Sequence, residues 1–428
     1  MPPLADHPQR YELAHELHAR PFPVLAAPCH AVFLAIMPEE GAASRDREAE
    51  HAHLVALLDR FGSSHPREGA THYFGPLGRH KLKWESHTEF TTYTIFVEGL
   101  AERPFDGEAF RVFPEDWLEA APGQRIVSAL VRVEENDGEP AEITRRIAGW
   151  FEDEGLAIAR VLDDSAVIAS DFRIDATGHS RLAVFVRPGT GQRRIGRIVQ
   201  RLLEIETYKT MSMLGLPVAR SLGGRLNAIE TRLAGLVAGL TERQAQAEGA
   251  LDALLGLSAE LEHMLAQHGY RFAATEAYSA LVGERIEALR EARFEGRQSF
   301  REFMTRRFDP AMRTCRATRA RLEGLTLRAA RAGELLRTRV DVERSAQNQA
   351  LLASMDRRAD QQLQLQRTVE GFSVVAISYY GVNLLTYLIG PMLHDTAGLS
   401  KPIVTAALVV PVVALVWATV RRIRNRIE

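Results

Sequence analysis

Two long uncharged runs near the C-terminus constrain this chain more than any other feature. Residues 371–393 and 402–420 contain no Asp, Glu, Lys or Arg. As helices they would be about 34 Å and about 28 Å long, which matches the hydrocarbon core of a bilayer. Because residues 394–401 allow only a tight connection between them, the runs predict an antiparallel transmembrane hairpin. The alternative is a pair of buried helices in a globular protein.

The flanking charges predict how this hairpin is oriented. The loop of residues 394–401 carries one basic residue, Lys401, whereas the tail of residues 421–428 carries Arg421, Arg422, Arg424 and Arg426. Positive residues beside membrane spans remain in the cytoplasm, and both ends of a hairpin face the same side. The N-terminus also lacks the apolar stretch of a signal peptide. We therefore expect a protein of the bacterial inner membrane with two spans and both termini in the cytoplasm.

Residues 1–190 have the mixed pattern of an α+β or α/β cytoplasmic domain. Residues 24–37 include an apolar strand, residues 45–61 form an amphipathic helix, and residues 81–97 alternate as paired strands do. Further strands are predicted at residues 125–133, 166–174 and 182–186, with a turn at residues 175–178.

Residues 191–370 predict long antiparallel helices that form a coiled-coil-like stalk. Leu226, Ile229 and Leu233 begin an apolar stripe with helical spacing, which is typical of a packing surface within one chain or between copies. Pro217 and Pro310 are the predicted breaks. The last helix, from about residue 311, is expected to run directly into the first span.

The arginine-rich stretch of residues 290–344 is interpreted as a solvated helical face. Its charges, such as Glu291 beside Arg290, are expected to form ion pairs within the helix. Contact with an anionic membrane surface is the alternative interpretation.

The first span carries polar side chains that a simple anchor does not need. Tyr379, Asn383, Tyr387 and Gly390 fall on one helical face, flanked by Ser378 and Thr386. An Asn side chain in hydrocarbon needs a polar partner, so Asn383 is expected to face another helix or a pore. The candidates for pore or helix contact are Tyr379, Tyr380, Gly381, Val382, Asn383 and Tyr387.

The rest of the sequence contains no motif that defines an enzyme. A nucleophile elbow, a phosphate loop and a dinucleotide fingerprint are all missing, so no cofactor is predicted and catalytic activity is left undecided, with a non-enzyme favoured. The net charge of −2 gives no reason to expect nucleic acid as a partner. Cys29 and Cys315 have no metal-ligand spacing and are expected to be idle thiols.

Histidines are concentrated in the first part of the chain, which raises the question of a metal site. Their spacings match no defined site, so surface and core positions are expected and metal binding stays undecided. An enzyme hypothesis would need several of His30, His72, His80 and His87 to converge with carboxylates. The concentrated histidines are His7, His15, His18, His30, His51, His53, His65, His72, His80 and His87.

Four segments resemble an uncharacterised, membrane-anchored proteobacterial family known as a domain of unknown function. The resemblance covers nearly the whole chain and implies a membrane anchor but no biochemical activity. The segments are residues 16–21 (ELHARP), 82–90 (LKWESHTEF), 206–211 (ETYKTM) and 369–373 (VEGFS).

The order of elements is similar to that of the CorA-type two-span divalent-cation channels. A mixed cytoplasmic domain precedes a long helix, a first span containing Tyr380-Gly381-Val382-Asn383, a short loop, a second span and a basic tail. The signature of that family is Tyr-Gly-Met-Asn, at the mouth of a pore formed by five subunits. The resemblance implies that Gly381, Val382 and Asn383 select a hydrated divalent cation. Here Val382 replaces the Met, and the motif lies near the middle of the apolar run.

Three functional hypotheses follow. The first is a membrane-anchored scaffold or regulator that forms a homo-oligomer through its helices, with the lipid bilayer and further copies of itself as partners. The second is a CorA-like channel or transporter with a divalent cation as a further partner. The third is a membrane-tethered enzyme that uses the N-terminal histidines.

Overall fold

The computed structural model describes residues 4–16, 21–39, 45–241, 247–397 and 401–427. The chain forms two compact units, and each is described by itself. The first contains Met1–Arg243 and Asp252–Ala332, and the second contains Gln244–Leu251 and Gly333–Glu428. These limits follow compactness, whereas the limits expected at residues 190 and 370 follow sequence pattern and stay predictions.

The first unit is built on a mixed sheet of nine strands, counted over the described residues. The strand order is β2-β3-β4-β1-β5-β8-β7-β6-β9, and every neighbouring pair is antiparallel except β5 and β8. The mixed α and β character predicted for this region is confirmed. The strands are β1 (Cys29–Met37), β2 (His72–Leu77), β3 (His80–Ser86), β4 (Thr91–Glu98), β5 (Gln124–Glu135), β6 (Ala157–Val161), β7 (Ala166–Ser170), β8 (Ser180–Val186) and β9 (Ala292–Arg293).

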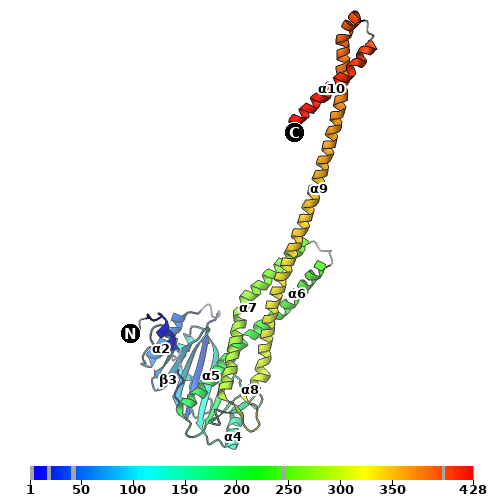
Figure 1. Ribbon diagram of the computed structural model, residues 1–428. Coiled ribbons are helices and arrows are strands. Elements are labelled where there is room, and N and C mark those ends of the chain that lie inside the picture. The colour runs from blue at the N-terminus through cyan, green and yellow to red at the C-terminus, as the bar shows by residue number, and fades with distance from the viewer. Residues whose placement is uncertain (1–3, 17–20, 40–44, 242–246, 398–400, 428) are drawn as a thin grey trace. The chain divides into compact units, whose positions relative to one another are not determined.

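Helices cover both faces of this sheet, which explains why the central strand β1 is apolar from Ala31 to Met37. Along β1, Ala31 and Phe33 face a core that includes α5, while Val32 and Leu34 face a second core that includes α2. Figure 1 labels α2 and α5 beside the sheet. The helices up to this point are α1 (Arg10–Glu16), α2 (Arg47–Arg60), α3 (Glu115–Glu119), α4 (Pro140–Trp150) and α5 (Gln192–Met213).

The helical part of the first unit packs through the predicted stripe. Leu226, Ile229 and Leu233 of α6 are buried in the same core as Leu261 of α7 and Leu325 of α9. Figure 1 shows α6 and α7 alongside the first part of α9. The remaining helices are α6 (Gly215–Thr241), α7 (Ala247–Leu289), α8 (Phe300–Phe303), α9 (Asp309–Ala397) and α10 (Lys401–Ile427), with a 3₁₀ turn at Gly107–Val112 and a π turn at Met304–Phe308.

One of the two predicted helix breaks needs correction. The predicted break at Pro217 lies at Leu214, and Pro217 stands in the first turn of α6, where its missing N–H costs no hydrogen bond. Pro310 does mark a boundary, because it is the second residue of α9. As predicted, this helix continues without interruption into the apolar run.

The expectation that residues 290–309 are entirely helical was wrong. Arg290 and Glu295 have positive φ angles of 48° and 49°, which end α7 and let β9 pair with β6. The predicted intrahelical ion pairs are replaced there by pairs to other elements. Arg290 Nη2 lies 2.7 Å from Asp163 Oδ2, and Arg297 Nη1 lies 3.2 Å from Asp153 Oδ1.

Candidate functional site

Strand β3 presents charged side chains to a cavity on the α5 side of the sheet. Successive residues of a strand point to opposite faces, so Leu82 and Trp84 enter the core that includes α2, whereas Lys83 and Glu85 line the cavity. Two adjoining spaces of about 30 Å³ and about 290 Å³ share five lining residues. The shared residues are Glu85, His87, Gln200, Glu204 and Tyr208.

The smaller space contains two buried polar atoms that lack hydrogen-bond partners among the described residues. Lys83 is 5% exposed, and its Nζ lies 3.1 Å from Glu85 Oε2 without the orientation of a hydrogen bond. The amide of Gln200 donates from Nε2 to Glu204 Oε1 at 2.7 Å, but its Oε1 accepts nothing. A donor and an acceptor are therefore left open in one cavity, an arrangement that is costly without water or a ligand.

The larger space contains one arginine without a carboxylate partner in the described part of the chain. Arg285 pairs with Glu204, whereas Arg201 donates from Nη1 to the carbonyl oxygen of Ala288 at 2.8 Å. Burial lowers the pKa of Arg201, and the neighbouring charges of Arg197, Arg285 and Arg290 lower it further against the opposing effect of Glu204. This environment disfavours another cation and favours an anion.

His87 lies in the connection between β3 and β4 and forms one wall of the cavity. Its ring stacks on Phe90 with centroids 4.5 Å apart, and it meets Tyr208 of α5 edge-on at 6.5 Å. Arg45 holds the connection from one side, because it donates to Ser86 Oγ at 2.9 Å and to the carbonyl oxygen of His87. This position is therefore fixed by contacts outside the cavity.

A second tie holds the same connection to α7. Glu89 is 1% exposed and forms an ion pair with Arg271, so the carboxylate is neutralised although it is buried. A buried charge without such a partner would cost several kcal/mol. The connection that carries His87 is thus held by Arg45 at Ser86 and His87 and by Arg271 at Glu89.

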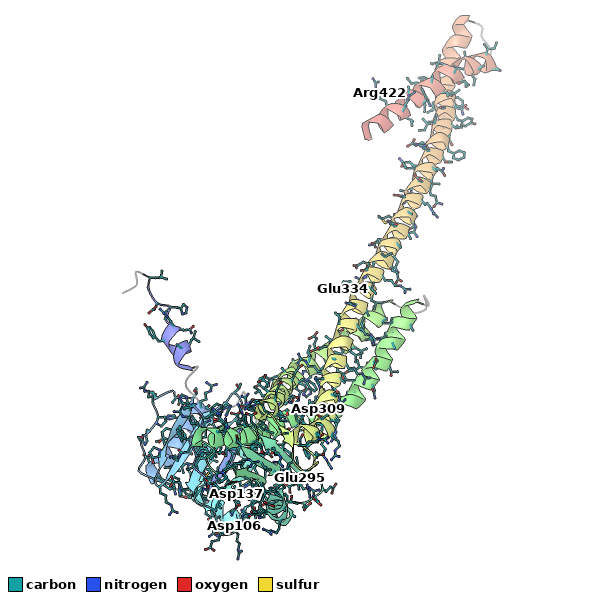
Figure 2. All side chains as sticks on the ribbon, turned by 60° about the horizontal axis from the view of Figure 1, so that its bottom comes forward. Asp106, Asp137, Glu295, Asp309, Glu334 and Arg422 are labelled. Atoms are coloured by element: carbon teal, nitrogen blue, oxygen red, sulfur yellow. The ribbon has the colours of Figure 1, made fainter. Side chains whose placement is uncertain are left out.

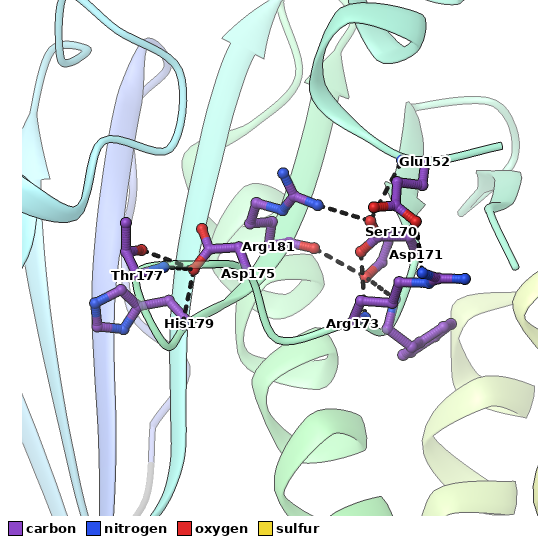
Figure 3. A network of polar contacts seen from close by, with 9 residues as sticks. Glu152, Ser170, Asp171, Arg173, Asp175, Thr177, His179 and Arg181 are labelled. Atoms are coloured by element: carbon purple, nitrogen blue, oxygen red, sulfur yellow. Dashed lines mark hydrogen bonds and ion pairs between the residues drawn. The ribbon is translucent and has the colours of Figure 1, made fainter. Parts of the chain in front are cut away.

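A different polar network closes the hairpin of β7 and β8 (Figure 3). Arg181 Nη2 donates to the buried Asp171 Oδ2 at 2.7 Å, and Asp175 Oδ1 accepts from the backbone N–H groups of Thr177 and His179. Burial would raise the pKa of Asp175, but the hydrogen bonds from Thr177 and His179 outweigh burial and lower it. The carboxylates of this network are satisfied within the hairpin, so its role is structural.

The histidines do not gather into the arrangement that the enzyme hypothesis requires. Of His30, His72, His80 and His87, only His87 lines the cavity. His30 Nδ1 contacts the carbonyl oxygen of Gly99 at 2.9 Å, and His72 lies opposite Glu85 in the ladder between β2 and β3. The described residues contain no group of three or more His, Cys, Asp or Glu placed to hold a metal ion. His18 and the side chain of His15 lie outside the described part.

The candidates predicted in the first span lie on different sides of α9. Tyr379, Tyr380 and Tyr387 are 65%, 67% and 71% exposed, whereas Val382 is 7% exposed and Gly381 and Asn383 are half-buried. Their predicted role as pore or contact residues stays a prediction. Arg421 lies over the Trp417 ring at 5.0 Å, and Arg422, labelled in Figure 2, is exposed. The surroundings of Gly390 and the side chains of Arg424 and Arg426 lie outside the described part.

The contact of α9 with α10 uses a neighbouring stripe. Ser378, Val382 and Thr386 are buried in the second unit, and a Cβ atom on Gly381 would lie 3.2 Å from Val412 Cγ1 of α10. Both α9 and α10 contain windows long and apolar enough to cross a membrane, within Phe300–Ile389 and Thr405–Ile423. Ser378 and Thr386, which were predicted to flank the polar stripe of the first span, thus belong to the contact between α9 and α10.

Sequence reasoning missed most of the cavity. The alternation of residues 81–97 predicted paired strands and no site, and no motif singled out Lys83, Gln200 or Arg201. One signal was present, because Lys83 is one of only a few lysines in an arginine-rich chain and stands between Leu82 and Trp84. A charge between two core residues of a strand is also the ordinary pattern of a solvent-facing side chain, so this signal alone did not indicate a cavity.

Segments that carry the family resemblance meet at this cavity. Lys83, Glu85 and His87 come from residues 82–90, while Thr207 and Tyr208 come from residues 206–211. Leu17 to Arg20 lie outside the described part, but Phe22, which follows that segment, also lines the larger space.

Comparison with known proteins adds a family assignment but no activity. No curated protein and no solved structure matches this chain. A family model matches residues 5–427, which include the sheet, the cavity, the long helices and both apolar runs. The chain therefore belongs to the family described as Protein of unknown function (DUF3422).

Proposed function

We propose that this protein is a membrane-anchored homo-oligomer that forms through α9 and acts as a scaffold or regulator at the cytoplasmic face of the inner membrane. The two apolar helices supply the anchor. The arginines at the C-terminal end of α10, beyond its apolar run, favour a cytoplasmic position for this end, and the hairpin then keeps the N-terminal unit on the same side.

The observation that carries this proposal is a long exposed section of α9. Every residue from Asp341 to Val369 is exposed, and Figure 2 displays the side chains around this helix. A helix in a protein gains most of its stability from packing its apolar face against other elements. We therefore expect a partner helix to cover this section.

The apolar residues of this section follow the spacing of a coiled coil. Alternating steps of four and three residues connect Leu351, Met355, Leu365, Val369 and Phe372, which are between 55% and 72% exposed. Arg358 and Gln362 are the polar positions in this seam, and the same steps lead on to Tyr379 and Asn383. The seam thus continues into the apolar run.

A second copy of the chain is the occupant that fits this seam. Each copy enters the same membrane in the same direction, so two copies of α9 must lie parallel and in register. The positions that flank the seam, such as Ser354, Gln361 and Thr368, are uncharged, so like charges of identical copies meet in this section at Arg358 and not along the flanks. In register, the Asn383 side chains would meet and satisfy one another within the membrane.

Disulfide trapping of the full chain in native membranes tests this oligomer. Leu365→Cys is expected to form a disulfide between copies, while Arg367→Cys, on the opposite side of the same helix, is not. The unmodified chain is a suitable background because Cys29 and Cys315 are buried. Equal trapping at both positions, or none at Leu365→Cys, would contradict the proposal.

Cation conduction is the second candidate function, favoured by the position of Asn383 on the same seam as Tyr379. In a ring of copies these polar side chains would line the central axis, next to the Tyr380-Gly381-Val382-Asn383 sequence. Purified protein in liposomes should then release or admit Mg²⁺, and Asn383→Ala should change that flux. A dimer in detergent, or flux equal to that of empty liposomes, removes this candidate and leaves the scaffold proposal intact.

A further inference from the structure

The cavity beside β3 contains one hydrogen-bond donor and one acceptor that have no hydrogen-bond partner among the described residues. Lys83 Nζ can only donate, and Gln200 Oε1 can only accept. A hydroxyl group placed between them would accept from the lysine and donate to the amide. The smaller space of about 30 Å³ suits a group of that size.

The charge of the joined cavity indicates what else the ligand must carry. Lys83 is next to Glu85, and Arg285 pairs with Glu204 and, at 3.7 Å, with the exposed Glu284. Arg201 is the arginine of the cavity lining that forms no ion pair with a described carboxylate. The larger space beside Arg201, about 290 Å³, has room for a small molecule.

We propose that the cavity binds a small hydroxycarboxylate, with its hydroxyl between Lys83 and Gln200 and its carboxylate toward Arg201. The rings of Phe90 and Tyr208 line the cavity and cover the carbon skeleton of the ligand. This site lies in the first unit and does not depend on the oligomer proposed above.

The scarcity of lysine allows a direct test on the full chain in detergent. Protein labelled with ¹³C at the lysine side-chain ε carbon gives signals only from Lys81, Lys83, Lys209 and Lys401. The Lys83 signal is identified by its loss in Lys83→Met. Lactate and glycerate are the probes, and either should shift the Lys83 signal saturably while the Lys81 signal stays in place.

Matched compounds and variants separate the proposal from its alternatives. Lactamide lacks the charge and propionate lacks the hydroxyl, so each should bind about tenfold more weakly or worse. Arg201→Gln should weaken binding to a similar degree while the Lys83 signal remains observable, and Arg220→Gln, an exposed arginine of α6, should have no effect. If the Lys83 signal responds to neither hydroxy acid, or if Arg201→Gln binds as the wild type does, the cavity holds only water and the proposal is wrong.

Discussion

The ring of His87 meets the ring of Tyr208 edge-on, with centroids 6.5 Å apart. This contact joins the connection between β3 and β4 to helix α5, although the two residues are far apart in the sequence. It brings together two of the segments by which the chain resembles its family. The cavity wall therefore depends on how closely α5 and its neighbours pack.

Gly196 allows the N-terminal segment to cross α5 in close contact. A Cβ atom at this position would lie 1.7 Å from the carbonyl oxygen of Pro23, so Gly196→Ala forces the two backbones apart. We expect a loss of about 1 to 3 kcal/mol in the free energy of unfolding, measured by thermal unfolding followed by near-UV circular dichroism.

Gly224→Ala is the matched control, because it lies in α6 with open space around the new Cβ. It should stabilise the protein by roughly 0.5 to 1 kcal/mol through the higher helix propensity of alanine. Equal effects of the two substitutions would show that the crossing at Pro23 is not tight.

The buried pair of Glu89 and Arg271 should be far more sensitive to loss of one partner than to loss of both. Arg271→Met leaves a 1% exposed carboxylate without its partner and should cost about 3 kcal/mol in chemical denaturation. Combining it with Glu89→Leu should recover much of that loss, because no unpaired charge remains.

Arg225→Met is the control for this pair. The side chains of Arg225 and Glu260, which form an ion pair, are 52% and 33% exposed. Loss of this pair should therefore lower the free energy of unfolding by less than about 1 kcal/mol. A double variant as unstable as Arg271→Met alone would mean that packing and not charge dominates at Glu89.

Protonation of His53 should weaken the first unit at mildly acidic pH. His53 Nδ1 lies 3.1 Å from Tyr93 Oη, and Nε2 lies 2.9 Å from the carbonyl oxygen of Trp117, an arrangement suited to the neutral ring. Burial lowers the pKa of His53 below its ordinary value, against the opposing hydrogen bond to Trp117. Below about pH 6.5 the unfolded chain then binds a proton that the folded chain does not.

The His53 contribution to stability is therefore complete above about pH 6.5 and is lost as the pH falls toward the lowered pKa. Chemical denaturation across this range should show a shallower pH dependence for His53→Gln than for the wild type. His263→Gln, at an exposed position of α7, should leave the wild-type slope unchanged. An unchanged slope in His53→Gln would assign the acid sensitivity to other groups.

Both native cysteines should be inert in the folded protein. Burial raises the pKa of the Cys29 thiol to about 12, with a further contribution from the charge of Glu98, and burial also raises the pKa of Cys315. Because the thiolate is the reactive form, a disulfide reagent such as DTNB at pH 8 should modify neither thiol before denaturant is added. Ser345→Cys, in the exposed section of α9, should react at once, and rapid reaction of the wild type would contradict the buried positions.

The local sequence pattern was sufficient to predict those elements that are long or strictly periodic. The alternation of residues 81–97 predicted the pair formed by β3 and β4, and the stripe of Leu226, Ile229 and Leu233 predicted the buried face of α6. Local pattern failed where pairing is imposed from a distance. The edge strand β2 contains Pro76, a residue whose presence argues against a strand in a sequence pattern. Strand β9 has only two residues and forms because they pair with β6.

The sequence by itself determined the apolar runs, the uninterrupted helix that enters the first of them and the mixed class of the N-terminal unit, because these depend on composition and spacing along the chain. Only the tertiary structure decided the cavity. In the sequence Lys83 alternates with core residues as a solvent-facing side chain would, and its burial arises because α5 packs across that face of the sheet. The polar groups that surround Lys83 and Glu85 include Gln200, Arg201 and Arg285, which come from two helices, α5 and α7. No spacing along the chain predicts that these residues meet at one cavity.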